Sequence, residues 1–175
     1  MHIAASPPSR SATALAALRI GVGILFLIFG EYKVFGTAFT LGGGFQGWIH
    51  QFIDGGTAYP FAVPVLQHVV LAHATPIAFL VAYGELAIGI ALTSGLLTRA
   101  ASACGVVYMV TLLFSSDYPG PHAPGWQYFG ASLDHLVLAM CFAAFLLGDP
   151  DQSLSVRAYL RGRRADPPRA AYQSR

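Results

Sequence analysis

Four stretches of this 175-residue chain are long and apolar enough to cross a lipid bilayer as helices: 15–35, 76–97, 99–116 and 127–148. A bilayer core of about 30 Å requires roughly 20 helical residues. Hydrophobic residues make up 55% of the chain and charged residues only 10%. A soluble domain of this size would have too little polar surface to cover itself. We therefore predict an all-α fold, an integral membrane four-helix bundle.

The first stretch has an alternative interpretation, because Arg10 precedes an apolar run as it would in a cleaved signal sequence. Arg19 interrupts that run, however. The nearest pair of small residues suited to cleavage, Gly36 and Ala38, comes only after the charged residue Lys33. These features favour a retained membrane helix over a signal sequence.

Basic residues predict the orientation of the bundle. With the N-terminus in the cytoplasm, nine of the ten fall on the inner side and Lys33 alone lies outside. This asymmetry follows the positive-inside rule. It predicts a cytoplasmic tail at 1–14, a membrane domain at 15–148 and a basic cytoplasmic tail at 149–175. We interpret the last as a solvated segment and, less favourably, as a docking element for a partner.

A long outer loop at 36–75 is the most unusual segment of the predicted bundle. Within it, apolar residues recur at helical spacing over 45–54, opposite a polar face: Phe45, Trp48, Ile49, Phe52 and Ile53. This stripe predicts a short amphipathic helix at the outer interface. A second apolar piece, 61–73, is bracketed by prolines and too short to cross. We expect it to form a lid or re-entrant element.

Glu85 lies deep inside the second predicted span. It follows Pro76 by nine residues, which places it roughly 14 Å from the outer end of that helix. An ionised carboxylate near mid-membrane costs at least about 3 kcal/mol, so it needs a cation, a wet cavity or a proton. Glu31 and Lys33 end the first span, and Asp134 and His135 lie near the outer start of the fourth. We predict an inward-facing polar site that joins Glu85 to His135 and to Lys33 or Glu31.

A simpler interpretation covers all of these polar residues except Glu85. Ser132 would cap a helix with Asp134 in its first turn, while Glu31 and Lys33 would extend toward the headgroups. Glu85 is too deep for that. We predict no metal site, because no histidine pair has i, i+4 spacing. Cys104 and Cys141 form no CxxC or CxxCH motif, so no covalently bound cofactor is expected.

Several short motifs resemble the DoxX/DoxD-like family of small four-helix membrane proteins. They are Arg19 followed by "GVGILFLIFGEYK", then "GELAIGIALTSGLLTRAA" with Glu85, and finally His135 in the last span. The resemblance covers roughly residues 15–148. It implies a bacterial or archaeal inner-membrane protein, related to subunits of a thiosulfate:quinone oxidoreductase or to proteins that accompany redox and detoxification enzymes. The long loop at 36–75 departs from the short-loop pattern of the family.

Three functions are compatible with these features. The favoured one is a quinone-linked oxidoreductase subunit in which Glu85 and His135 exchange protons with a diffusible quinone and Asp134 orients His135. Glu31 and Lys33 would then bind substrate. The second is a non-enzymatic scaffold or accessory subunit of a redox complex. The third, a small transporter, lacks the expected inverted repeat. The expected partners are lipid, a quinone and a second oxidoreductase subunit, with no nucleic acid.

Overall fold

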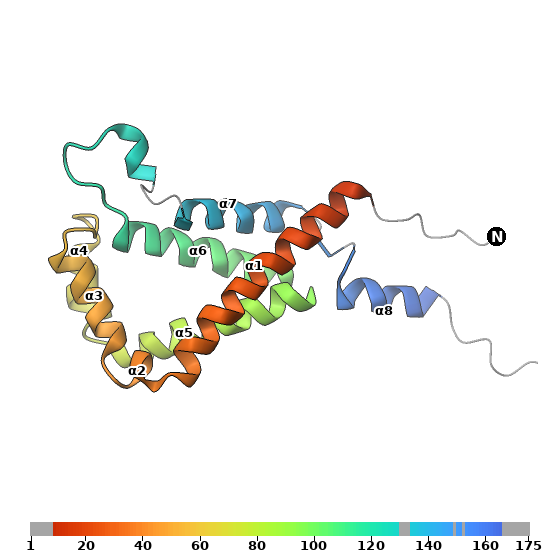
Figure 1. The fold of residues 1–175 in the computed structure, drawn as a ribbon, viewed down its shortest axis with the longest axis horizontal. Helices are drawn as coiled ribbons and strands as arrows, with labels where there is room; N and C mark the ends of the chain where they lie inside the picture. The colour runs from red at the N-terminus through yellow and green to blue at the C-terminus, as the bar shows by residue number, and fades with distance from the viewer. Residues whose placement is uncertain (1–8, 130–133, 149, 152, 166–175) are drawn as a thin grey trace, which may run out of the picture.

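The computed structural model describes residues 9–129, 134–148, 150–151 and 153–165, all of which are helical or in turns and loops. Four helices run back and forth along the molecule (Figure 1). They are α1 (Arg10–Phe35), α5 (Ala74–Ser94), α6 (Thr98–Ser116) and α7 (Asp134–Leu147). The described part of the chain contains no β-strand. The predicted all-α helical bundle is therefore confirmed.

Within the described segments, three helices are long and apolar enough to cross a membrane: α1, α5 and α6. They match the first three predicted spans to within five residues at each end. The fourth span was expected to begin at Gln127. Instead a short 3-10 helix, η2 (Gly125–Phe129), precedes the 14-residue α7. At 1.5 Å per residue α7 extends only about 21 Å. It begins at Asp134, an acidic residue that the positive end of the helix dipole favours.

Glycines allow α1 and α5 to pack backbone against backbone. A Cβ atom on Gly30 would lie 2.7 Å from the backbone nitrogen of Leu86, and one on Gly89 would lie 2.7 Å from that of Leu27. Side chains larger than hydrogen are therefore excluded from this contact. In lipid, where no hydrophobic force drives helices together, such close contacts supply the packing energy.

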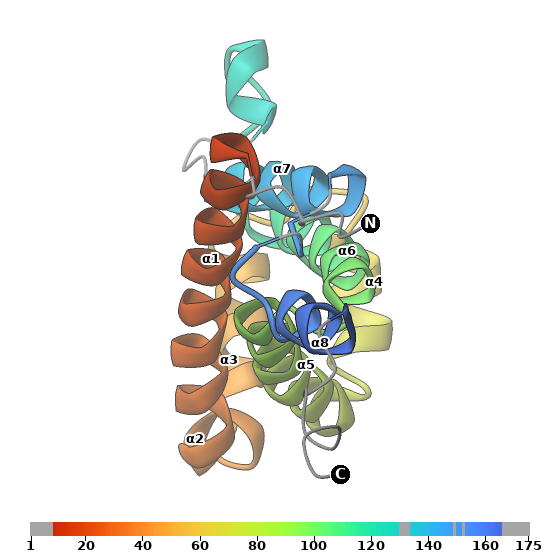
Figure 2. The ribbon, with the colours of Figure 1, turned by 90° about the vertical axis from the view of Figure 1, so that its right-hand side faces the viewer.

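A second helix pair is formed by α6 and α7, which lie side by side in both views (Figures 1 and 2). Gly105 of α6 faces the ring of Phe142 of α7, which is fully buried. Phe142 also meets Phe26 of α1 edge to face, with ring centroids 5.2 Å apart. These aromatic contacts join the two helix pairs into one core.

We call the end of the bundle that carries α2–α4 and residues 117–129 the loop end (Figure 1). Its short helices are α2 (Thr37–Thr40), α3 (Gly44–Asp54), α4 (Val63–Val65) and the π-helical η1 (Leu66–Val70). The helix predicted at 45–54 thus exists as α3. Phe45 and Ile49 of its apolar stripe are buried in a cluster with Ala78 and Ala82 of α5, whereas Trp48 is exposed. The stripe therefore packs mainly on the bundle.

The opposite end, which we call the tail end, carries α8 (Val156–Ala165) and faces the viewer in Figure 2. Here Asp151 is buried and accepts a hydrogen bond of 2.6 Å from the hydroxyl of Thr98. Ser153 is buried as well. The start of the basic tail is therefore packed against the beginning of α6, where Asp151 finds its partner. The prediction of a fully solvated segment was too simple.

Candidate functional site

Glu85 lies near the middle of α5, eleven residues after Ala74 and nine before Ser94. Its exposed fraction is 5%. The apolar run that surrounds it forms a continuous helix because nothing in the sequence from Ile77 to Ser94 breaks it; the glycine that ends the helix is Gly95, with a left-handed φ of 71°. Glu85 therefore lies well inside a continuous helix, as the sequence predicts.

Two side chains from neighbouring helices meet Glu85 at a single oxygen. The ammonium group of Lys33, near the end of α1, lies 2.5 Å from Oε1. The hydroxyl of Tyr108, in the middle of α6, donates to the same oxygen at 2.5 Å. The Lys33 nitrogen also lies 5.2 Å from the centre of the Phe39 ring, a cation–π contact from the loop end. Three helices therefore converge on one carboxylate.

The second oxygen of Glu85, Oε2, is buried and has no hydrogen-bonding partner in the described part of the chain. Leaving a buried polar atom unsatisfied costs about 1–3 kcal/mol. The ion pair with Lys33 offsets the burial of the charge but does not satisfy this oxygen. Glu85 consequently retains one acceptor without a partner among the described residues.

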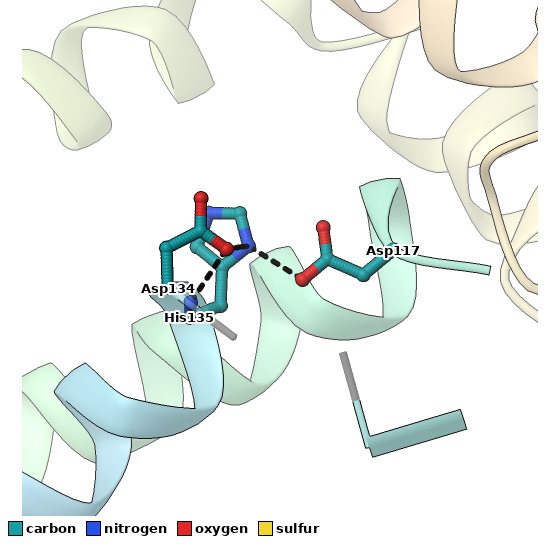
Figure 3. Close-up of side chains that lie close together, drawn as sticks. All are labelled: Asp117, Asp134 and His135. Carbon is teal, nitrogen blue, oxygen red and sulfur yellow. Dashed lines mark hydrogen bonds and ion pairs between the residues drawn. The ribbon is translucent and has the colours of Figure 1, made fainter. Parts of the chain in front are cut away.

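A separate polar cluster lies at the loop end, where α6 ends and α7 begins (Figure 3). The Nδ1 atom of His135 lies 2.8 Å from Oδ2 of Asp117 and 3.7 Å from Oδ1 of Asp134. The backbone N–H of His135 also donates to Asp134 at 3.0 Å. The Asp117 side chain is 7% exposed and that of His135 is 22% exposed. This cluster is close to solvent, whereas Glu85 is not.

An aromatic group borders this cluster and joins two loops. Tyr59 is buried and donates its hydroxyl to the backbone carbonyl of Tyr128 at 2.5 Å. Its ring also packs on Phe114 and Tyr118. Burial, with a smaller contribution from the negative charge of Asp117, raises the pKa of the Tyr59 hydroxyl. Tyr59 therefore stays neutral and remains a hydrogen-bond donor that holds residues 117–129 in place.

The predicted site residues fall into two groups rather than one. Lys33 and Glu85 are brought together, and Asp134 and His135 lie in the other cluster. Along α6, Tyr108 and Asp117 are nine residues apart, about 14 Å in a helix. None of the described contacts joins Glu85 to His135. Glu31 is exposed and has no ionic partner in the segments that the structure describes.

Two residues of these clusters were not predicted. Tyr108 is the one phenol in the span 99–116, and its mid-span position was the available signal. Asp117 was not recognised as a site residue because it begins the stretch "DYPGP", which has the composition of a turn. Neither contact follows from spacing along the chain, since both partners lie on other helices.

The loop-end cluster also has the kinds of side chain that can bind a metal ion. Among the described residues, Asp117, Asp134 and His135 form one group in which a carboxylate or imidazole atom from each lies within 4.8 Å of the others. The Nδ1 atom is hydrogen-bonded to a carboxylate in this arrangement. We interpret the group as an acid–base cluster, and the prediction that the chain has no metal site remains a prediction.

A family model named DoxX matches residues 14–116, more than half of the chain. The chain belongs to the DoxX family. No curated protein and no solved structure matches it. The matched DoxX segment includes Lys33, Glu85 and Tyr108 and ends one residue before Asp117. The mid-bundle site therefore lies within the family region, while the loop-end cluster is formed outside it.

Proposed function

We propose that this DoxX protein is the membrane subunit of a quinone-linked oxidoreductase, in which Glu85 exchanges a proton with a ring oxygen of the quinone. The observation that carries the proposal is the free Oε2 of a carboxylate that is 5% exposed in the middle of an apolar helix. A diffusible quinone suits an apolar bundle with a few convergent polar groups.

The chemistry divides between protons and electrons. Reduction of a quinone to a quinol consumes two electrons and two protons. Lys33 and Tyr108 fix Oε1, so that Oε2 is the atom left to accept or donate a proton. The electrons come from a reduced donor, such as a reduced sulfur compound, or through a second subunit, since the sequence has no motif for a bound redox centre.

The ligand can be tested directly with decylubiquinone. We expect the full chain in lipid nanodiscs to bind it, and Glu85→Leu to weaken binding at least tenfold by isothermal titration calorimetry. Glu31→Gln is the matched control, because it changes an exposed carboxylate on the neighbouring helix. Equal binding by the wild type and Glu85→Leu would refute the proposal.

A second candidate is a non-enzymatic scaffold, and the Lys33–Glu85 pair favours it, because such a pair can serve only to fix helix packing. On this hypothesis an apolar replacement of both residues, Lys33→Met with Glu85→Leu, keeps or raises stability. Thermal unfolding of the double variant measures this stability. An unfolding temperature equal to or above that of the wild type, together with no bound quinone in mass spectra of the wild type, would favour the scaffold.

We further propose a bacterial or archaeal inner membrane as the location, with both termini cytoplasmic. The support is the nine-to-one asymmetry of the basic residues across the spans. In this orientation the loop end faces outward. A phosphatase reporter fused at Thr57 should be active in the periplasm, and one fused at Ser174 should be inactive. The reverse pattern would refute the orientation.

A further inference from the structure

The carboxylate within hydrogen-bond distance of the His135 imidazole is not that of its neighbour in sequence. Asp117 lies 2.8 Å from Nδ1, within hydrogen-bond distance, whereas Asp134 lies at 3.7 Å, beyond it. The two also differ in burial, since the Asp117 side chain is 7% exposed and that of Asp134 is 59% exposed. Charge interactions are weakened less by solvent at a buried group. Asp117 is therefore the stronger partner of the imidazole.

Asp117 is itself held in position by the end of α6. It is the C-cap residue, and its backbone N–H donates to the carbonyl of Leu113 at 3.2 Å. Its second carboxylate oxygen, Oδ1, accepts a hydrogen bond of 2.9 Å from the hydroxyl of Ser116. A backbone hydrogen bond fixes the chain that follows, since the N–H of Tyr118 donates to the carbonyl of Thr57 at 2.7 Å. The fixed backbone therefore holds Oδ2 of Asp117 toward the imidazole of His135.

A carboxylate on Nδ1 determines what His135 can do at its other nitrogen. When Nδ1–H donates to Asp117, the neutral imidazole carries its lone pair on Nε2. No contact of Nε2 is found in the part of the chain that the structure describes, and the side chain is 22% exposed. Nε2 is thus the atom open to water or to a ligand.

We propose that Asp117 is the positioning residue that holds His135 as the acid–base group of the loop end, with Nε2 as the atom that exchanges protons. This inference rests on the proposed function and adds a second proton-exchanging group to it. A proton passes from water or from a substrate hydroxyl to Nε2, and the imidazolium formed is stabilised by Asp117 and Asp134. No electrons move in this step. The other titratable groups nearby are Tyr59, which interacts with the charge of Asp117, and Tyr118 and Tyr128, whose rings pack on Tyr59.

The tautomer of His135 provides the test, because it can be read from ¹⁵N chemical shifts of the full chain in nanodiscs at alkaline pH. We expect the wild type to carry its proton on Nδ1. In Asp117→Asn the ratio of the Nδ1–H to the Nε2–H form should fall at least tenfold, because a neutral amide holds the N–H less strongly. Asp134→Asn is the matched control and should change the ratio less than threefold.

Three results would overturn the inference. They are an Nε2–H tautomer in the wild type, an effect of Asp134→Asn as large as that of Asp117→Asn, and a shift of the Nδ1 signal on addition of micromolar zinc, which would indicate a metal ligand instead. The wild-type spectrum alone decides the first, even if a variant fails to fold. None of these readouts involves a quinone, so the inference and the proposed quinone site can fail separately.

Discussion

Arg19 and Glu85 are both charged side chains buried within long apolar helices, but they have partners of different kinds. The guanidinium of Arg19 is 0% exposed and donates to two backbone carbonyls, that of Leu92 near the end of α5 and that of Leu154 in the tail, the latter at 2.7 Å. Glu85 meets two side chains, the ammonium of Lys33 and the hydroxyl of Tyr108.

The difference separates a structural role from a chemical one. A backbone carbonyl cannot change its protonation state, and it moves only if the chain moves, so Arg19 fixes the tail end to α5. An ammonium and a phenol, by contrast, can exchange protons. Each charge keeps one buried atom without a hydrogen-bonding partner among the described residues, Nε of Arg19 and Oε2 of Glu85, but only the second is an acceptor that can take up a proton. A charge bound to backbone therefore indicates architecture, whereas a charge bound to side chains with a spare acceptor indicates a site.

The largest expected effect follows from removing the structural charge. Arg19→Leu should lower the free energy of unfolding by about 3 kcal/mol, because it deletes two charge-assisted hydrogen bonds. Thermal unfolding in nanodiscs measures the loss. Arg157→Gln is the control: its side chain is 58% exposed and 3.8 Å from Asp151, so its loss should stay below about 1 kcal/mol. Similar losses of unfolding free energy in Arg19→Leu and Arg157→Gln would contradict the structural role of Arg19.

A smaller effect should come from the contact that brings Lys33 and Glu85 together. Gly89→Ala places a Cβ atom 2.7 Å from the backbone of α1 and should cost about 2 kcal/mol, because the helices must move apart. It should also weaken decylubiquinone binding. Gly84→Ala, on the same helix with nothing within 4 Å of the new atom, should be neutral or slightly stabilising. If both variants unfold at the wild-type temperature, the α1–α5 contact is not close-packed.

The smallest effect concerns one hydroxyl. Tyr108→Phe keeps the ring but removes the hydrogen bond to Oε1, so we expect a loss of about 1 kcal/mol in the free energy of unfolding. Oε1 is then held by Lys33 alone, so Glu85 is less firmly fixed, which should weaken decylubiquinone binding several-fold. The control is Tyr83→Phe on α5, where the residue is 53% exposed. It should change neither the free energy of unfolding nor the affinity for decylubiquinone. An unaltered affinity in Tyr108→Phe would exclude Tyr108 from the site.

The sequence predicts the helices well because apolar length is a local property. Helices α1, α5 and α6 follow from it, as does the depth of Glu85 within α5. Partners on other helices do not follow, because they depend on how the helices rotate and cross. The sequence left two candidates, Lys33 and Glu31, as the charged partner of Glu85, and it did not predict the contact with Tyr108. Gln127, the expected first residue of the fourth span, lies in the 3-10 helix η2, because apolar composition alone does not distinguish a 3-10 turn from an α-helix.

The tail illustrates the same limit. Its arginines predict a solvated segment, and half-exposed Arg157 agrees with this. Here Thr98 donates to the buried Asp151 and Arg19 donates to the carbonyl of Leu154, and no periodic pattern in the sequence marks such contacts. Short polar segments that dock through hydrogen bonds carry little signal in hydropathy.

The central claim, that Glu85 is the proton-exchanging group of the bundle, can be tested most directly by infrared difference spectroscopy. The measurement compares the full chain with oxidised and with chemically reduced decylubiquinone bound. We predict a carboxyl band that changes on reduction in the wild type and in Glu31→Gln, and that is absent in Glu85→Gln. A difference spectrum in which Glu85→Gln retains the same band as the wild type would contradict the claim.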